Sequence, residues 1–265
     1  YPSNDMTMED YDALARQLTD TTYGSQVYGC HYHTWRSAVE LFGILDGKHS
    51  ILDGNYDWMI PYYDMILSEE DDGVCQTYTD LSTEGLHYSA AFSNGNVAMM
   101  NMGSWFISTL ISNLDSGEYD SSLCGNWGIA SYPHPDGAEA GSTIATITGL
   151  AVTSASANKD AAFDFVNWVS GTEGAKVMAS TGNFPAIMTD DVINTIAGMA
   201  GFPTDESSKE ALNITNAYLE VPYAENVSEI NSILDTYHTS IMNREVTVEE
   251  GVASMNEQVG KILNQ

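Results

Sequence analysis

Residues 97–105 constrain the fold more than any other stretch. They read Val-Ala-Met-Met-Asn-Met-Gly-Ser-Trp, an apolar run that ends at Gly103, Ser104 and Trp105. Apolar residues then recur at helical spacing, at Phe106, Leu110, Ile111 and Leu114. The pattern predicts a buried strand that leads into a helix. Gly103 would allow a sharp turn or a close backbone approach, and Ser104 would cap the helix.

Trp105 would stand at the exposed start of this helix. An indole there can offer a flat apolar face to a ligand while its N–H remains hydrated. A sugar suits such a face because one side of a pyranose is mostly C–H. The alternative is that Trp105 packs in the core.

The charge of the chain excludes several partners. Its 265 residues carry 37 acidic side chains against 8 basic ones, a net charge of −29. Such a surface repels phosphate backbones, so we expect no nucleic-acid partner. With 43% hydrophobic residues the chain can fold into one large domain or two modest ones.

The cysteines leave the redox state open. Cys30, Cys75 and Cys124 form neither an even disulfide framework nor a Cys-x-x-Cys zinc motif. One disulfide with one free thiol and three buried thiols are both compatible with this count. No apolar run approaches the ~20 residues that span a bilayer. Because Tyr1 is not a start residue, we expect the chain to be a processed or trimmed piece of a longer protein.

Helical and strand-like patterns alternate, which predicts an α/β fold. We expect strands at 26–33, 126–131 and 150–152. Expected helices follow Thr7, Asn158, Asn226 and Thr247, and two more cover 35–45 and the stretch from Thr172 to Gly182. Thr7 and Thr247 begin capping boxes, with Asp10 and Glu250 three residues later.

Metal and enzyme motifs are weak or missing in the sequence. His31 and His33 lie two apart on one strand face and could ligate a metal, but no third ligand is apparent. Asp53 begins a calcium-like run, yet Trp58 replaces the required glycine. No P-loop, nucleophile elbow or zinc-protease motif occurs, and with 37 acids paired carboxylates arise by chance. We therefore expect no enzyme and no cofactor.

Several segments together resemble the extracellular solute-binding proteins of carbohydrate ABC importers, the maltose-binding-protein-like family 1. In chain order they are 8–19, 30–35 with Gly47 and Lys48, 92–105, 126–133, 148–166, 182–186 and 247–250. The resemblance implies an α/β periplasmic-binding-protein-like fold of type II, mostly its C-terminal lobe. Family members begin with a long segment that forms most of the first lobe, whereas this chain begins where the second lobe normally starts. On this basis 1–140 would be the first part of the C-terminal lobe and 181–265 its later helices. Residues 141–180 would normally complete the N-terminal lobe.

The resemblance also implies ligand-binding residues. It places Tyr32 and Trp105 at ligand-facing positions, with His31, His33 and Trp35 nearby. The remaining expected ligand-binding residues are Ser104, Asn126, Trp127 and Asn231. Trp35 shares a predicted helix face with Val39 and Phe42, which favours core packing for that ring.

The implied function is transport. The protein would bind a carbohydrate, an oligosaccharide in particular, in an interlobe cleft and deliver it to the transmembrane subunits of an ABC permease. It would act as a monomer, either lipid-anchored at the extracellular face of the cytoplasmic membrane or in the periplasm. The alternatives are a glycan-processing enzyme domain and a non-catalytic surface adhesion domain.

Overall fold

The computed structural model describes residues 1–22, 24 and 26–264. Their helices and irregular segments form two compact units. Unit 1 comprises residues 1–101, 130–146 and 214–265, and unit 2 comprises 102–129 and 147–213. No helix in the described part of the chain is both long and apolar enough to cross a membrane.

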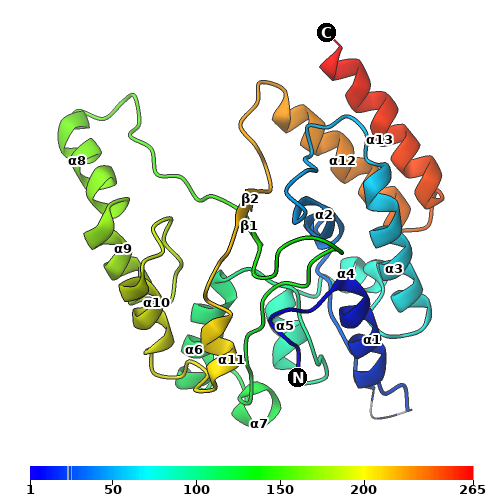
Figure 1. Cartoon of the computed structure of the whole chain (residues 1–265), viewed down its shortest axis with the longest axis horizontal. Helices are drawn as coiled ribbons and strands as arrows, with labels where there is room; N and C mark the ends of the chain where they lie inside the picture. The colour runs from blue at the N-terminus through cyan, green and yellow to red at the C-terminus, as the bar shows by residue number, and fades with distance from the viewer. Residues whose placement is uncertain (23, 25, 265) are drawn as a thin grey trace. The chain divides into compact units, whose positions relative to one another are not determined.

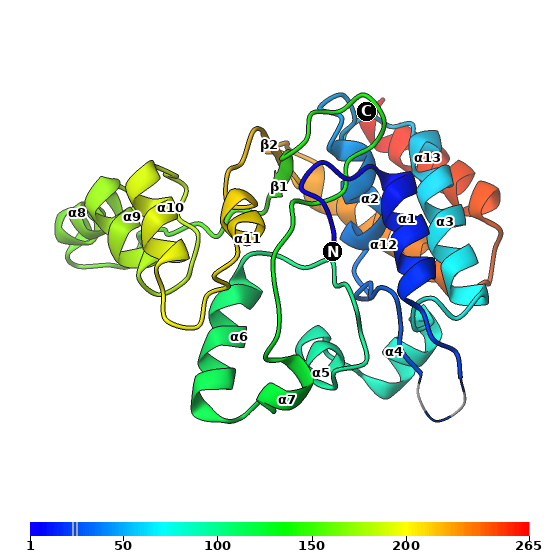
Figure 2. The ribbon, with the colours of Figure 1, turned by 60° about the horizontal axis from the view of Figure 1, so that its bottom comes forward.

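Unit 1 is built mainly from helices packed around one core. They are α1 (Met8–Leu18), α2 (Ser37–Ile44), the 3-10 helix η1 (Asp57–Met59), α3 (Ile60–Asp71), α4 (Tyr78–Glu84), α5 (Tyr88–Ser93), α12 (Val227–Met242) and α13 (Val248–Leu263). Helices α12 and α13 lie side by side, and α13 packs against α3 (Figure 1). Helix α3 also contacts α1 and α2 (Figure 2). Tyr11, Phe42, Tyr63, Leu234 and Met255 are buried in the core.

Both predicted capping boxes are confirmed. In the second, the backbone N–H of Glu250 donates to Thr247 Oγ1 at 3.2 Å, and the N–H of Thr247 donates to Glu250 Oε2 at 3.1 Å. Asn158 and Asn226 also precede helices as predicted, but neither side chain makes a capping hydrogen bond. The residues of a capping box bond to each other within one helical turn, so their spacing in the sequence was enough to identify them.

The sheet of unit 1 is small. Strands β1 (Thr143–Ala145) and β2 (Ala217–Leu219) pair in parallel, with Ile144 opposite Tyr218. Single parallel bridges also join Tyr28 to Val97 and His31 to Met100. The segments around 28–31 and 97–100 therefore lie side by side, but the continuous strands predicted at 26–33 and before Gly103 do not form.

Unit 2 contains α6 (Trp105–Ser116), α7 (Ser121–Cys124), α8 (Lys159–Val169), α9 (Thr172–Ala179), α10 (Asp190–Ala197) and α11 (Glu206–Glu210). Its core gathers apolar side chains that include Val192, Ile196 and Phe202. Helix α8 buries none of its residues, although its sequence is amphipathic. Phe163, Phe165 and Trp168 are 61%, 60% and 49% exposed, so the apolar face of α8 lies uncovered in this chain.

The strands predicted at 126–131 and 150–152 are wrong. A strand needs a neighbouring backbone to complete its ladder. In the first segment, the N–H of Ile129 donates to Ser208 Oγ at 2.9 Å and that of Ser131 to Asn4 Oδ1 at 2.9 Å, so side chains replace a ladder. In the second, Leu150 is exposed and no described backbone pairs with the segment.

Candidate functional site

A cluster of imidazole and aromatic rings forms the candidate site of unit 1. The ring centroid of His33 lies 4.5 Å from that of Trp35, 5.8 Å from that of His87 and 5.4 Å from that of Tyr88. The ring of His31 stacks toward His33 at 6.5 Å. We call these five residues the His33 cluster.

Two structural features position the cluster. The segment that carries His31 and His33 lies against the apolar run that precedes Gly103, and the N–H of Asn101 donates to the carbonyl of His31 at 3.4 Å. His87 is the N-cap of α5, and its ring lies at the start of that helix, 2.7 Å from Ser89 Oγ. The long-range backbone contact and the helix start together bring four rings around His33.

Several buried polar atoms of the cluster and of nearby Asn101 have no hydrogen-bond partner among the described residues. They are both ring nitrogens of His31, Nδ1 of His33 and Nδ2 of Asn101. Gln76 lies next to the His31 ring without a well-aligned hydrogen bond to it. Buried polar groups in folded proteins are nearly always paired. Each of these atoms is shielded from solvent in this structure, so a ligand would meet the exposed ring of Trp35 rather than these atoms.

The imidazoles of His31 and His33 are neutral near pH 7. Burial, with a smaller contribution from neighbouring His33, lowers the pKa of His31 to about 4. Burial and His87 also lower the pKa of His33. A neutral imidazole presents one N–H donor and one acceptor nitrogen, which matches the dual character of a hydroxyl group.

Tyr32 lies in the core rather than in the cluster. It is 6% exposed, and its hydroxyl donates to Glu69 Oε2 at 2.7 Å. Its ring meets Tyr11 and Phe42 edge-on. In this structure the ring of Tyr32 has no face open to a ligand.

The prediction that Trp35 packs in the core is wrong. Helix α2 begins only at Ser37, so Trp35 precedes the helical face that carries Val39 and Phe42. Its side chain is 43% exposed and its ring contacts those of His33 and Tyr88. Trp35 thus offers the aromatic surface that the sequence led us to expect of Tyr32.

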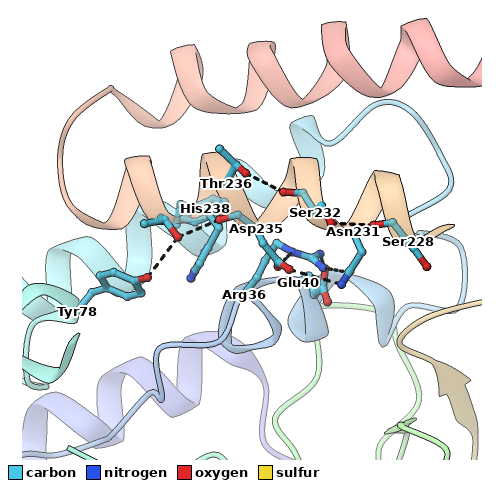
Figure 3. Close-up of polar contacts among 11 residues, drawn as sticks. Arg36, Glu40, Tyr78, Ser228, Asn231, Ser232, Asp235, Thr236 and His238 are labelled. Carbon is cyan, nitrogen blue, oxygen red and sulfur yellow. Dashed lines mark hydrogen bonds and ion pairs between the residues drawn. The ribbon is translucent and has the colours of Figure 1, made fainter. Parts of the chain in front are cut away.

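Asn231 lies in a polar network on α12 (Figure 3). Its Oδ1 accepts a hydrogen bond from the guanidinium of Arg36, which also pairs with Glu40. The Nε of Arg36 donates to Asp235 Oδ1 at 2.8 Å. The predicted ligand residue Asn231 is therefore engaged in linking α12 to the N-cap of α2.

In unit 2, Trp105 is the first residue of α6 and is 41% exposed, as the sequence predicted. Its indole folds back over Gly103, where a Cβ atom would lie 2.0 Å from the ring. A larger residue at position 103 would therefore displace the indole. Ser104 has helical backbone angles and makes no side-chain capping bond, so its predicted capping role is wrong.

Asn126 and Trp127 lie elsewhere in unit 2. Asn126 is exposed, and Trp127 is half-buried against Phe202, with ring centroids 6.2 Å apart.

The sequence did not lead us to expect His87, Tyr88 or Asn101 at the site. The interruption of an apolar run by Asn101 was a detectable signal, whereas the place of His87 and Tyr88 depends on a long-range contact.

Metal-ligating side chains gather at one place in the described residues. Cys30, Glu69 and Cys75 bring their ligand atoms within 4.8 Å of one another. His31 and His33 are not part of any such group of three or more among the described residues.

The fold is that of periplasmic binding proteins. A sugar transporter from Rhizobium etli in an open conformation matches with a TM-score of 0.90 and 47% sequence identity, over 98% of this chain and 65% of that one. An ABC substrate-binding protein from Listeria monocytogenes, in complex with cycloalternan, matches with a TM-score of 0.75 and 20% identity, over 100% and 65% of the two chains. A maltose/maltodextrin-binding domain from Bdellovibrio bacteriovorus, bound to maltotriose, matches with a TM-score of 0.68 and 15% identity, over 100% and 68%.

Residues 55–197 match the family model described as bacterial extracellular solute-binding protein, and the chain belongs to this family. It is a family of binding proteins rather than enzymes. The chain spans about 65% of the length of the Rhizobium and Listeria proteins. No curated protein matches the sequence.

Proposed function

We propose that the full-length protein binds an oligosaccharide and delivers it to an ABC permease. The observation that carries this proposal is the half-exposed ring of Trp35 in contact with the neutral imidazole of His33. Neutral donors and acceptors next to an aromatic face suit an uncharged polyhydroxylated ligand. The 47% identity to a protein described as a sugar transporter supports the same ligand class.

We assign the chain mostly to the C-terminal lobe of a type II binding protein, with 141–180 completing the N-terminal lobe in the full-length protein. The uncovered apolar face of α8 supports this assignment, since exposed apolar surface of this kind is normally buried against another element. The greater length of the Rhizobium relative supports it too, because a further third of that chain has no counterpart here.

The mechanism that follows is a shift between open and closed states. A sugar that gains contacts only when the lobes close stabilises the closed state by that difference in affinity. No bond is made or broken. The closed protein would then dock, as a monomer, on the transmembrane subunits of its permease. This function places the protein outside the cytoplasmic membrane, lipid-anchored or periplasmic.

Calorimetric titration of the full-length protein with maltotriose, cycloalternan and glucose tests the proposal. We expect saturable binding of at least one oligosaccharide, and a loss on the order of 1–3 kcal/mol of binding free energy in the His33→Ala variant. His49→Ala is the matched control, because the ring of His49 also contacts a tryptophan, Trp58, with ring centroids 4.9 Å apart, but lies outside the cluster.

Equal losses in the two histidine variants would contradict the assignment of the site. Cleavage products after prolonged incubation with the oligosaccharides would favour the glycan-processing enzyme. Binding to immobilised cell-surface glycans, without affinity for any soluble sugar, would favour the adhesion domain.

A further inference from the structure

Two buried cysteines distant in sequence lie next to each other in unit 1. The Sγ atoms of Cys30 and Cys75 and a carboxylate oxygen of Glu69 lie within 4.8 Å of one another. The backbone N–H of Cys30 donates to the carbonyl of Val74 at 3.4 Å, which holds the two cysteine backbones side by side. Cys30 and Cys75 are 0% and 2% exposed.

We propose that Cys30 and Cys75 form a disulfide in the exported protein. The inference rests on the proposed function in one respect, since it takes the protein to be exported to an oxidising compartment, where disulfides persist. Both residues are free thiols in this structure with their Sγ atoms within 4.8 Å, so the side chains must turn toward each other to reach the ~2.05 Å of a disulfide bond. Cys124 lies in α7 of unit 2 and remains a thiol.

The oxidant is a dithiol–disulfide exchange catalyst or a small-molecule disulfide. The thiolate of one cysteine attacks the oxidant's disulfide, and one oxidant sulfur leaves as a thiol. The second cysteine thiolate then attacks the mixed disulfide, and the other oxidant sulfur leaves. The two cysteines lose two electrons and two protons, and the two sulfurs of the oxidant become thiols. Because both sulfurs are buried in the folded protein, the exchange takes place while the chain is folding.

The alternative occupant of this place is a divalent metal, and the surroundings disfavour it. Only three donors are present among the described residues, one fewer than a tetrahedral zinc site uses. A hydrogen bond with Cys30, burial and nearby Glu69 raise the pKa of Cys75 well above its usual value. A metal needs deprotonated thiols, whereas a disulfide carries no charge to bury.

The disulfide would link the two chain segments that carry His31 and Gln76. Cys30 directly precedes His31, and Cys75 directly precedes Gln76, whose side chain lies beside the His31 ring. A covalent link between the two segments would limit how far His31 and Gln76 separate. It would also restrict the unfolded chain over the segment between the cysteines.

The test is a peptide map of the full-length protein, secreted into a bacterial periplasm and alkylated without reduction. Glutamyl endopeptidase separates all three cysteines, because Glu40, Glu69, Glu84 and Glu118 lie between them. Trypsin would leave Cys75 and Cys124 on one fragment, because no lysine or arginine lies between Lys48 and Lys159. We expect a cross-linked Cys30–Cys75 peptide and an alkylated Cys124 peptide. We also expect reduction to lower the melting temperature by about 10 °C.

Alkylation of both Cys30 and Cys75 in the unreduced protein would overturn the proposal. So would stoichiometric zinc in the purified protein that is lost in Glu69→Gln. The peptide map is made on the unsubstituted protein, so its result does not depend on the folding of any variant. Cys124→Ser is the control and should leave the cross-link intact. The same sample is titrated with sugar, so a disulfide without sugar binding would count against the transport function alone, and sugar binding without a disulfide against this inference alone.

Discussion

Replacing Arg36 with methionine should destabilise the protein strongly. The side chains of Arg36 and Glu40 are 4% and 1% exposed and pair within one helical turn. The guanidinium also bonds to Asn231 and Asp235, so it links the start of α2 to α12 (Figure 3). Methionine keeps the length and apolar volume of the side chain but leaves the Glu40 carboxylate buried without its partner.

The magnitude follows from that unpaired charge. Removing one partner of a buried ion pair costs about 3–5 kcal/mol, whereas replacing both partners with apolar residues is often neutral. We therefore expect Arg36→Met to lose about 3–5 kcal/mol of unfolding free energy. The double variant Arg36→Met/Glu40→Met should recover most of that loss.

Urea unfolding of the full-length protein, monitored by circular dichroism, measures the unfolding free energy of the single and the double variant. The midpoint should fall in the single variant while the slope stays constant. Asp235→Asn is the control. The Asp235 side chain is 54% exposed, and an exposed pair contributes roughly 0–1 kcal/mol. A single variant that loses less than about 1 kcal/mol, or a double variant no more stable than the single, would refute the reasoning.

Two further predictions concern Glu69 and Gly103. Burial raises the pKa of Glu69 to about 8, so the native state keeps a proton that the unfolded chain, with its ordinary pKa of 4.5, has released. The free energy of unfolding should therefore fall as pH rises from about 4.5 to about 8. Urea titrations across this range should show a weaker pH dependence in Glu69→Gln. An unchanged pH dependence would contradict the raised pKa of Glu69. Gly103→Ala should displace the Trp105 indole and weaken oligosaccharide binding, as measured by calorimetry. Gly149→Ala is the control, because no atom lies within 4 Å of the added Cβ, and it should leave binding unchanged. Equal effects of the two substitutions would argue against a ligand role for Trp105.

Features set by residues near one another in the chain were predictable. The capping boxes at Thr7 and Thr247 require only a hydroxyl and a carboxylate three residues apart. The helix that starts at Trp105 follows from its apolar spacing, and the glycine two residues earlier allows the indole to fold back. The family was recognisable for the same reason, since ordered local segments carry the resemblance.

Only the tertiary structure decided features that depend on partners distant in sequence. Segments 126–131 and 150–152 have strand-like composition, but no neighbouring backbone pairs with them, and a strand without a partner does not form. Trp35 became half-exposed because α2 begins two residues after it. Folding brings Cys30 next to Cys75, two residues from distant chain segments. It likewise brings His33 next to the rings at the start of α5. Periodicity reports which face of an element is apolar, but the contacts that define this site are made between elements, and their pairing is set by packing of the whole unit.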